Sequence, residues 1–256
     1  RIDTIAIDKT GTITAGQMSL DSVVPTKGGD EAELLAVAAT LESASEHPIA
    51  RAVVAAHSGP LRQLTGFANV PGRGVRALVD GRPAVAGNAA LMADLGLAVP
   101  GELIAAADEA ARRGASVLLV ALDDRIVGLL TVADRIAPNA GAAVTRLREL
   151  GLRTVMVTGD NQAAAEYVAA QVGIDEVRAE VLPSDKFAVV TQLQADGTHH
   201  VAMIGDGVND AAALSQADLG IAMGSGTDAA IAASDLTLMR HDLMLAADAV
   251  QLSRRT

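Results

Sequence analysis

The feature that most constrains the fold is a regular alternation of short apolar segments and helical segments after Asp134. The apolar segments have the length of buried strands, and stretches of helical periodicity separate them. Expected strands cover residues 153–157, 177–180, 200–204 and 219–222, and expected helices cover residues 137–150, 162–172, 186–196 and 210–216. Strands that alternate with helices are typical of a doubly wound parallel sheet. The C-terminal half is therefore predicted to fold as an α/β domain.

The middle of the chain has a different pattern. Residues 64–86 form short alternating runs broken by Gly and Pro, which is typical of an antiparallel sheet. Helical stretches are expected at residues 30–56 and 100–113, and a hairpin is expected at residues 117–132. This region is predicted to form a smaller α+β domain.

The opening strand, residues 2–7, ends at Asp8 and leads into a polar connector to about Ser22. It has no place in the antiparallel region, but it fits as a strand of the later parallel sheet. We therefore expect one α/β domain made of residues 1–22 and 132–256. An inserted domain of residues 23–131 would interrupt it.

Composition excludes several classes of function. Half of the residues are hydrophobic, but only 1% are aromatic, so stacking platforms for nucleic acid are nearly absent. The net charge of −11 also opposes a nucleic-acid partner. The sequence has no cysteine, which excludes disulfides and thiolate metal sites. No window of about 18 apolar residues is free of charge, so no membrane span is expected. The abrupt ends suggest a piece of a longer chain.

Polar side chains follow four segments of the expected parallel sheet. The clusters are Asp8, the run Thr158-Gly159-Asp160, Lys186, and the pair Asp206 and Asp210. Ligands collect at the carboxyl ends of parallel strands, so these groups should meet at one edge. Clustered carboxylates need a cation, and hard oxygen ligands favour Mg²⁺. A carboxylate can attack a phosphoryl group when a metal and a lysine neutralise the charge.

Any one of these clusters has an equally good explanation as a helix cap or a turn residue. Four clusters in this order, each after a strand, favour a catalytic site over four coincidental caps.

Three of these clusters lie in the segments Asp8-Lys9-Thr10-Gly11-Thr12, Thr158-Gly159-Asp160 and Gly205-Asp206-Gly207-Val208-Asn209-Asp210. These segments resemble the signature motifs of P-type ATPases in the haloacid dehalogenase superfamily. The resemblance implies a haloacid dehalogenase-like fold in which Asp8 becomes an aspartyl-phosphate.

The resemblance also implies roles for the neighbouring residues. Thr158 and Lys186 would bind the phosphoryl oxygens, with Gly159 and Asp160 in the same catalytic loop. Mg²⁺ would be held by Asp8, Asp206 and the backbone carbonyl of Thr10. Asn209 and Asp210 would support that metal site.

Thr10 separates this chain from many phosphatases of the same superfamily. Those enzymes carry an aspartate two positions after the nucleophile, which acts as a general acid and base. Threonine cannot act as a carboxylate base, so hydrolysis of the phosphoenzyme is expected to be slow. A pump needs an intermediate that lives long enough to drive a conformational change.

The inserted region contains the segments Ser45-Glu46-His47-Pro48, Gly72-Arg73-Gly74-Val75 and Gly87-Asn88. Together they resemble the nucleotide-binding domain of heavy-metal-transporting P-type ATPases. The resemblance implies that Glu46 and His47 face the adenine of ATP, and that Gly72 and Gly74 let the backbone approach the phosphates. Separately, a histidine near a helix end is most often a cap or surface residue, and an isolated Gly-x-Gly is a weak signal.

Other segments are less specific. Asp134-Arg135-Ile136-Ala137-Pro138 matches a hinge element of the family, except that Ala137 stands where a basic residue is common. The His199-His200 pair has no third ligand in an obvious motif, so a metal site there is disfavoured. Basic residues in the tail Gln251–Thr256 would suit the cytoplasmic end of a following membrane helix.

The combined expectation is the cytoplasmic ATP-binding and phosphorylation unit of a heavy-metal pump in the cell membrane. Its partners would be ATP, a heavy-metal ion, and the actuator and transmembrane domains of the parent protein. The segments Ser225-Gly226-Thr227-Asp228 and Asp235-Leu236-Thr237-Leu238 look most like those of copper transporters. Zinc, cadmium and cobalt remain open, as do a freestanding phosphatase and a regulatory nucleotide-binding module.

Overall fold

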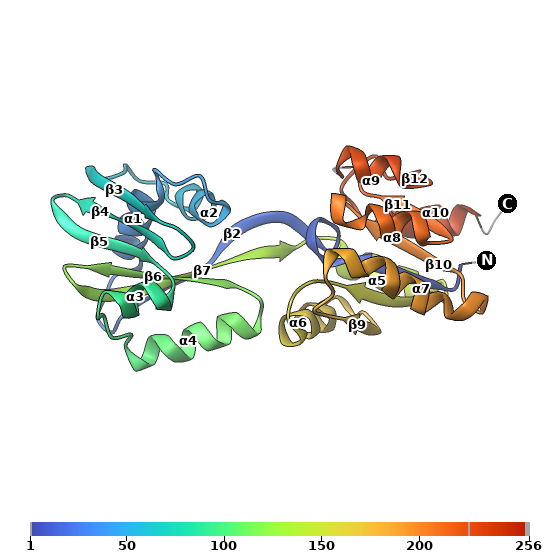
Figure 1. Ribbon diagram of the computed structural model, residues 1–256, viewed down its shortest axis with the longest axis horizontal. Coiled ribbons are helices and arrows are strands. Elements are labelled where there is room, and N and C mark those ends of the chain that lie inside the picture. The colour runs from blue at the N-terminus through green and yellow to red at the C-terminus, as the bar shows by residue number, and fades with distance from the viewer. Residues whose placement is uncertain (1, 225, 254–256) are drawn as a thin grey trace. The chain divides into compact units, whose positions relative to one another are not determined.

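The structure is a computed structural model, and it describes residues 2–224 and 226–253 (Figure 1). Ser225 and the tail residues from Arg254 on lie outside the described residues, so the predictions that fall on them are not tested. The chain forms two units. The discontinuous unit contains the residues up to Gln17 and those from Asp134 on, and the inserted unit is Met18–Ala133. The predicted boundaries at residues 22 and 132 fall within β2 (Thr14–Pro25) and β7 (Arg125–Ile136).

The discontinuous unit is built on a parallel sheet in the order β12-β11-β10-β1-β8-β9. Its strands are β1 (Thr4–Asp8), β8 (Arg153–Val157), β9 (Glu176–Arg178), β10 (Val201–Gly205), β11 (Leu219–Ala222) and β12 (Leu236–Thr237). The opening strand lies inside this sheet, between β10 and β8, with Ile5 opposite both Ala202 and Thr154. The prediction that β1 belongs to the later sheet is therefore confirmed.

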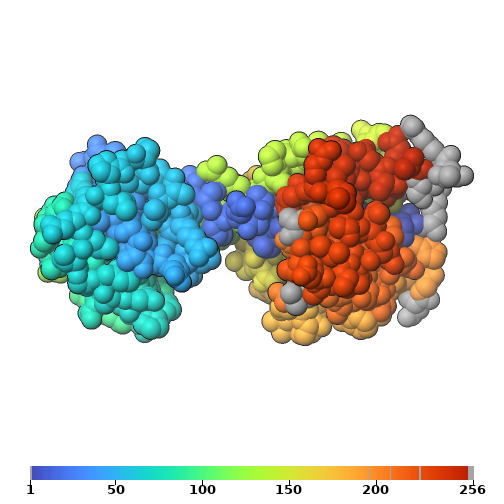
Figure 2. All heavy atoms as spheres, turned by 90° about the horizontal axis from the view of Figure 1, so that it is seen from above, coloured from blue at the N-terminus to red at the C-terminus, as the bar shows by residue number. Residues whose placement is uncertain are grey.

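Helices cover both faces of this sheet, so its central strands are buried on both sides. Ile5 and Ile7 of β1 pack with α5 (Ala140–Glu149), α6 (Gln162–Val172) and α10 (Met244–Ser253). Ala6 points to the other face, which is covered by α7 (Lys186–Gln194), α8 (Ala211–Gln216) and α9 (Asp228–Ala232). The C-terminal elements, in red, form much of the surface of this unit seen in Figure 2.

The inserted unit is built on a sheet in the order β2-β7-β6-β5-β4-β3. The strands from β3 to β7 pair in antiparallel fashion, and their bounds are β3 (Leu64–Val70), β4 (Gly74–Val79), β5 (Arg82–Gly87) and β6 (Ser116–Leu122). One face packs against α1 (Glu31–Glu42) and α2 (Pro48–Ala56). The other packs against α3 (Ala89–Asp94) and α4 (Gly101–Arg112). The predicted antiparallel α+β insertion is confirmed.

Two predicted elements differ from the structure. The helical stretch expected at residues 30–56 is two helices, since the first ends at Glu42 and the second begins at Pro48. Proline has no N–H to donate and is well placed at the first position of a helix. The polar connector expected before Ser22 is the twelve-residue strand β2, which pairs with β7. Its residues are mostly exposed or half-buried, so the apolar alternation of a strand is weak there.

Within residues 2–224 and 226–253, no helix combines the length and the apolar character needed to cross a membrane.

Candidate functional site

Asp8 ends the strand at which the sheet changes direction. From β1 the chain order runs outward through β8 and β9 on one side, and through β10, β11 and β12 on the other. Such a reversal leaves a crevice beyond the carboxyl ends of the strands, where ligands bind in open α/β sheets. The side chain of Asp8 is only 6% exposed. The fold therefore places a buried carboxylate at the point most suited to a ligand.

The turn after Asp8, η1 (Lys9–Ile13), brings a second carboxylate close to the first. Gly11 has a φ of 70°, a left-handed value that favours glycine. A Cβ at this position would overlap with the carboxylate of Asp206. The N–H of Gly11 donates to the hydroxyl of Thr14, 3.2 Å away, which fixes the turn. Gly11 is thus the residue that lets Asp206 approach the turn after Asp8.

Lys186 begins α7 and is buried beneath the same edge. Its Nζ donates to Oδ1 of Asp8 at 2.5 Å and to Oδ1 of Asp210 at 2.6 Å. Its own side chain is only 9% exposed. One buried ammonium therefore bridges two buried carboxylates.

Asp210 also shapes the loop that carries Asp206. Its Oδ2 accepts from the backbone N–H groups of Asp206 and Gly207, at 3.2 and 3.1 Å. Gly205 leaves room for this contact, because a Cβ there would lie 2.7 Å from the Asp210 carboxyl group. Asp210 thus fixes the backbone, while the Asp206 side chain stays half-buried at the edge.

The charges of this group are unbalanced. Burial, together with the carboxylates of Asp210 and Asp206, raises the pKa of Asp8 to about 7, although Lys186 opposes the shift. Burial and Asp210 also raise the pKa of Asp206. Burial lowers the pKa of Lys186, but the carboxylates of Asp8 and Asp210 outweigh it and raise that pKa. Three carboxyl groups around one lysine favour an added cation.

The donor set fits Mg²⁺. One carboxylate oxygen each from Asp8, Asp206 and Asp210 lie within 4.8 Å of one another. Oxygen ligands with room for water and phosphate are those that Mg²⁺ prefers. Nearby in the same turn, the hydroxyl of Thr12 is buried and has no hydrogen-bond partner within the described part of the chain. A buried polar atom without a partner is costly, so this hydroxyl is available to a ligand.

The loop after β8 reaches the same edge. Lys9 Nζ lies 2.5 Å from Oδ2 of Asp160, which links the turn after Asp8 to this loop. The hydroxyl of Thr158, a buried residue, accepts from the N–H of Asp160 at 3.1 Å, and Gly159 between them is exposed. The structure therefore brings the predicted residues of this loop to the sheet edge that carries Asp8.

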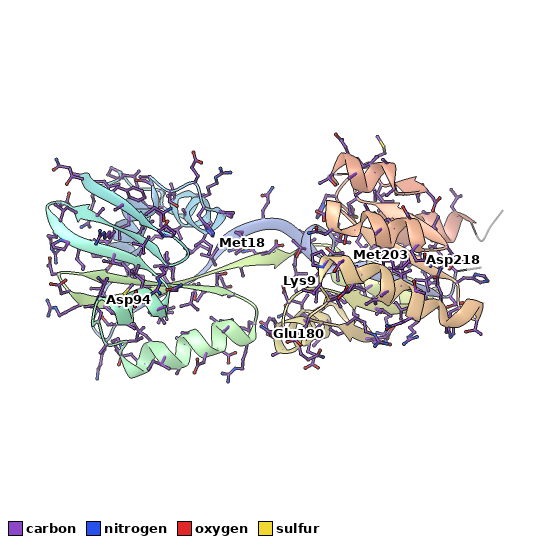
Figure 3. The ribbon with its side chains drawn as sticks, in the orientation of Figure 1. Lys9, Met18, Asp94, Glu180, Met203 and Asp218 are labelled. Atoms are coloured by element: carbon purple, nitrogen blue, oxygen red, sulfur yellow. The ribbon has the colours of Figure 1, made fainter. Side chains whose placement is uncertain are left out.

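Two predicted site residues of this unit remain, together with the histidine pair at which a metal site is disfavoured. Thr10 and Asn209 are exposed on the loops of the same edge. His200 lies at the opposite end of the sheet, where its Nδ1 is 3.4 Å from Oδ1 of Asp218, and His199 pairs with Asp3. Figure 3 shows Lys9 and Asp218 at opposite ends of this unit. The two histidines therefore have separate carboxylate partners, far from the candidate catalytic edge.

Asp134 closes the turn that leaves the candidate catalytic edge. Its Oδ2 accepts from the Thr14 hydroxyl at 2.6 Å, and its Oδ1 accepts from the N–H of Gln17 at 3.1 Å. The N–H of Ala137 donates to the carbonyl of Ile13 at 2.9 Å. The hinge role predicted for Asp134 stays a prediction, but its contacts join the two chain segments on which such a role would act.

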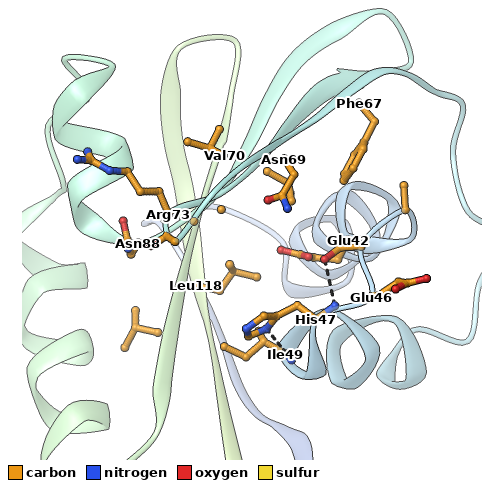
Figure 4. A pocket seen from close by; sticks show the side chains of 17 residues that line it. Glu42, Glu46, His47, Ile49, Phe67, Asn69, Val70, Arg73, Asn88 and Leu118 are labelled. Carbon is orange, nitrogen blue, oxygen red and sulfur yellow. Dashed lines mark hydrogen bonds between the residues drawn. The ribbon is translucent and has the colours of Figure 1, made fainter.

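The inserted unit holds a pocket of about 670 Å³ between α1, α2 and the antiparallel sheet (Figure 4). This volume suits a ligand of nucleotide size. All six predicted nucleotide-binding residues line it: Glu46, His47, Gly72, Gly74, Gly87 and Asn88. Segments that are far apart in sequence thus meet around one cavity.

His47 has a structural role as well as a place in the pocket. Its Nδ1 accepts from the N–H of Ile49 at 3.2 Å and so caps α2. Because Nδ1 is an acceptor here, the neutral ring carries its proton on Nε2. The capping interpretation and the pocket interpretation of His47 are therefore compatible, since the cap orients a donor for a ligand.

The glycines hold two backbone segments in contact. Gly74 has a φ of 149°, and a Cβ there would overlap with the carbonyl of Ala86. The side chain of Asn88 donates to the Gly72 carbonyl at 3.1 Å and caps α3 through the N–H of Leu91. The glycine turn is therefore fixed against the end of β5 at the rim of the pocket.

Glu42 is a pocket residue that the sequence analysis missed. It ends α1, is only 4% exposed and lines the cavity. Burial raises its pKa to about 7, although a hydrogen bond from Ser45 opposes the shift. In Figure 4 its carboxyl group points into the pocket, whereas the Glu46 side chain points away from the centre. The available signal was helical spacing, because residue 42 follows Ala38 by four positions on an apolar face.

Comparison with known proteins agrees with this architecture. A family model described as haloacid dehalogenase-like hydrolase matches residues 2–218. The probable copper-exporting P-type ATPase V of Mycobacterium tuberculosis is 48% identical over all of this chain, which covers 34% of that protein. The copper-exporting P-type ATPase of Bacillus subtilis is 42% identical over all of this chain and 32% of its own length.

A solved structure of a transport ATPase also has a similar fold. The crystal structure of a zinc-transporting PIB-type ATPase in the E2.Pi state matches with a TM-score of 0.90 and 33% identity. That match covers all of this chain and 41% of the other. The chain thus spans about a third of the length of the curated relatives named above. By its motif turn, its parallel sheet and the family match, the chain belongs to the haloacid dehalogenase-like hydrolases.

Proposed function

We propose that this chain is the ATP-binding and phosphorylation unit of a heavy-metal-translocating P-type ATPase. The observation that carries the proposal is the contact of Lys186 with Asp8 at 2.5 Å, with Asp206 beside them across Gly11. A buried nucleophilic carboxylate, a bridging lysine and a metal-type carboxylate are the parts that phosphoryl transfer to aspartate requires.

In the proposed reaction, an oxygen of Asp8 attacks the γ-phosphorus of ATP. A bond forms between that oxygen and phosphorus, the bond to the β–γ bridging oxygen breaks, and ADP leaves with the electron pair. Lys186 would compensate the charge on the transferred group, and the Thr158 hydroxyl would donate to one of its oxygens. Mg²⁺, held by Asp8, Asp206 and the carbonyl of Thr10, would supply further charge neutralisation.

Thr10 supports a long-lived phosphoenzyme. It stands two residues after the nucleophile and is exposed at the catalytic edge. A threonine there cannot take a proton from an attacking water. Phosphate would therefore remain on Asp8 until another domain supplies a base, as a transport cycle needs.

ATP would bind in the pocket of the inserted unit. We assign the adenine to the region of His47 and Glu42, where a ring N–H and a buried carboxyl face the cavity. The predicted contact from Glu46 remains part of the proposal. The glycine turn at Gly72 and Gly74 would leave the backbone open to the phosphates.

The parent protein would couple ATP hydrolysis to export of a metal ion across a membrane, with this chain on the cytoplasmic side. Actuator and transmembrane domains would belong to the two thirds of the length that this chain does not cover. Copper is the first candidate ion, since relatives at 48% and 42% identity are called copper-exporting. Zinc is the second, since the 33% identical structural match is called zinc-transporting.

The test uses the full-length parent protein in membranes or detergent. ATPase activity is measured with Cu⁺, Zn²⁺, Cd²⁺ and Co²⁺ in turn, with Asp8→Asn as the control. The proposal expects one ion to stimulate activity, and the Asp8→Asn variant to lose it. Lack of stimulation by every ion, or full activity of Asp8→Asn, would contradict the transport function. Steady hydrolysis of small phosphate esters without a trapped phosphoenzyme would instead favour a freestanding phosphatase.

A further inference from the structure

The pocket of the inserted unit has one permanently cationic residue among its described lining. The titratable lining residues are Glu42, Glu46, His47 and Arg73. The chain as a whole carries a net charge of −11. A ligand with several phosphate charges therefore meets mostly acidic surroundings, and Arg73 is the side chain best suited to attract it.

Although Arg73 lines the pocket, its guanidinium contacts two residues that do not line it. Its guanidinium forms an ion pair with Asp94 and donates to the carbonyl of Ala90 at 3.5 Å, both on α3. Figure 4 shows the side chain running from the glycine turn towards this helix. The two side chains are 42% and 58% exposed, so the pair lies in solvent. Solvent screens such pairs, and they contribute little to stability.

The backbone of Arg73, in contrast, is held firmly. Its N–H donates to the carbonyl of Val70 at 3.0 Å, and its carbonyl accepts from the N–H of Asn88 at 2.9 Å. Gly74 and Gly87 pack so closely behind it that neither could carry a Cβ. The guanidinium can therefore change partners by rotation about its side-chain bonds, without movement of the turn.

We propose that Arg73 is a phosphate-binding residue of the nucleotide pocket, and that Asp94 competes with the nucleotide for its guanidinium. The proposal rests on ATP binding in this pocket, as in the proposed function. In the free protein Asp94 holds Arg73 on α3. When a nucleotide enters, its phosphates displace the carboxylate, because they offer more negative charge and more acceptor oxygens in a geometry that guanidinium matches. Arg73 thereby selects nucleotides with several phosphates over the bare nucleoside.

The test measures dissociation constants for ATP and adenosine on the 256-residue chain, by amide chemical-shift titration with a metal chelator present. The variants are Arg73→Ala and Asp94→Asn. The matched control is Asp123→Asn, which removes a similarly exposed ion pair with Arg82, away from the pocket. Thermal unfolding of each variant checks that the inserted unit stays folded.

We expect Arg73→Ala to weaken ATP binding roughly tenfold, the effect of one charge-assisted contact, with adenosine changed less than twofold. Asp94→Asn should strengthen ATP binding about two- to threefold, because the competing charge is gone. Asp123→Asn should change neither ligand.

Equal losses for ATP and adenosine in Arg73→Ala would show that the residue supports the turn and does not bind phosphate. Unchanged ATP affinity in Asp94→Asn would overturn the competition. If the unaltered chain bound neither ligand, the nucleotide-binding function itself would fail, whereas normal ATP binding with an unaffected Arg73→Ala would overturn only this inference.

Discussion

The Nζ atom of Lys186 lies 2.5 Å from Oδ1 of Asp8, although 178 positions separate the two residues in the chain. The contact forms because β1 and the start of α7 meet at the carboxyl edge of one parallel sheet. The same ammonium reaches Asp210 at 2.6 Å, so two buried carboxylates share one positive charge. Most predictions of the catalytic chemistry depend on this arrangement.

Replacement of Lys186 by methionine should abolish most phosphoenzyme formation. The variant keeps an unbranched side chain of nearly the same length, but it leaves Asp8 and Asp210 facing each other without a cation. The rate of acid-stable labelling by γ-labelled ATP should fall roughly 100- to 1000-fold, the range seen when a charge-stabilising group is removed. Lys27→Met, at an exposed lysine of the inserted unit, is the control. Labelling of Lys186→Met at the rate of the control would contradict the assigned role.

Gly11→Ala should abolish phosphoenzyme labelling, for two reasons that can be separated. A left-handed backbone with a Cβ costs roughly 1–2 kcal/mol, and the new methyl group would also displace the Asp206 carboxylate. Gly151→Ala is the matched control, since Gly151 has a φ of 74° and open space around its Cβ position. Both variants should lower the thermal midpoint, but only Gly11→Ala should lose labelling. Equal labelling of the two would show that Asp206 does not need this approach.

Thr10→Asp should shorten the life of the phosphoenzyme. The new carboxylate would stand two residues after Asp8, where it can accept a proton from an attacking water. Dephosphorylation should accelerate roughly 100-fold, the lower end of the range for general-base catalysis. Decay is measured by a chase with unlabelled ATP, and Thr10→Asn serves as the uncharged control of the same shape. Identical decay in the Asp and Asn variants would remove the explanation given for Thr10.

The two roles of His47 can be separated by substitution. His47→Ala loses both the helix cap and the ring, so stability should fall by about 1 kcal/mol and ATP affinity by roughly tenfold. His47→Asn keeps an acceptor for the Ile49 N–H and should lose only ATP affinity. Thermal unfolding and ATP titration of both variants are the measurements. Unchanged ATP affinity in His47→Ala would eliminate the adenine-site assignment.

Glu42 should make the stability of the inserted unit depend on pH. Its pKa is raised from 4.5 to about 7 by burial, so the folded chain binds the proton more tightly than the unfolded chain does. The stabilising contribution is therefore present below pH 4.5 and is lost as pH rises through about 7. The loss by pH 8 should be at most about 3 kcal/mol.

The measurement compares thermal unfolding of the native chain and of Glu42→Gln between pH 5 and pH 8. The Gln variant cannot ionise, so its stability should fall less over this range. If the stability of the two chains fell equally between pH 5 and pH 8, ionisation of Glu42 would not be the cause of the pH dependence.

Elements with strong local signals could be predicted from the sequence. The strand at residues 153–157, the helix at residues 162–172 and the strand at residues 219–222 have the bounds that the pattern indicated. Strand β2 escaped prediction because its pairing with β7, more than its own composition, makes it a strand. Glu42 was not predicted because a charged residue at a helix end is usually exposed to solvent, and only the structure shows that this one is buried.

The sequence by itself determined which candidate catalytic side chains this protein has and which strands they follow. Asp8, Lys186, Asp206 and the glycines beside them follow apolar segments whose periodicity is local, so short-range patterns were enough to identify them. Only the tertiary structure decided that Lys186 bridges Asp8 and Asp210, that Glu42 is buried in the pocket, and that Arg73 is paired with Asp94. Such contacts depend on distances and burial between residues remote in the chain, which no local pattern encodes.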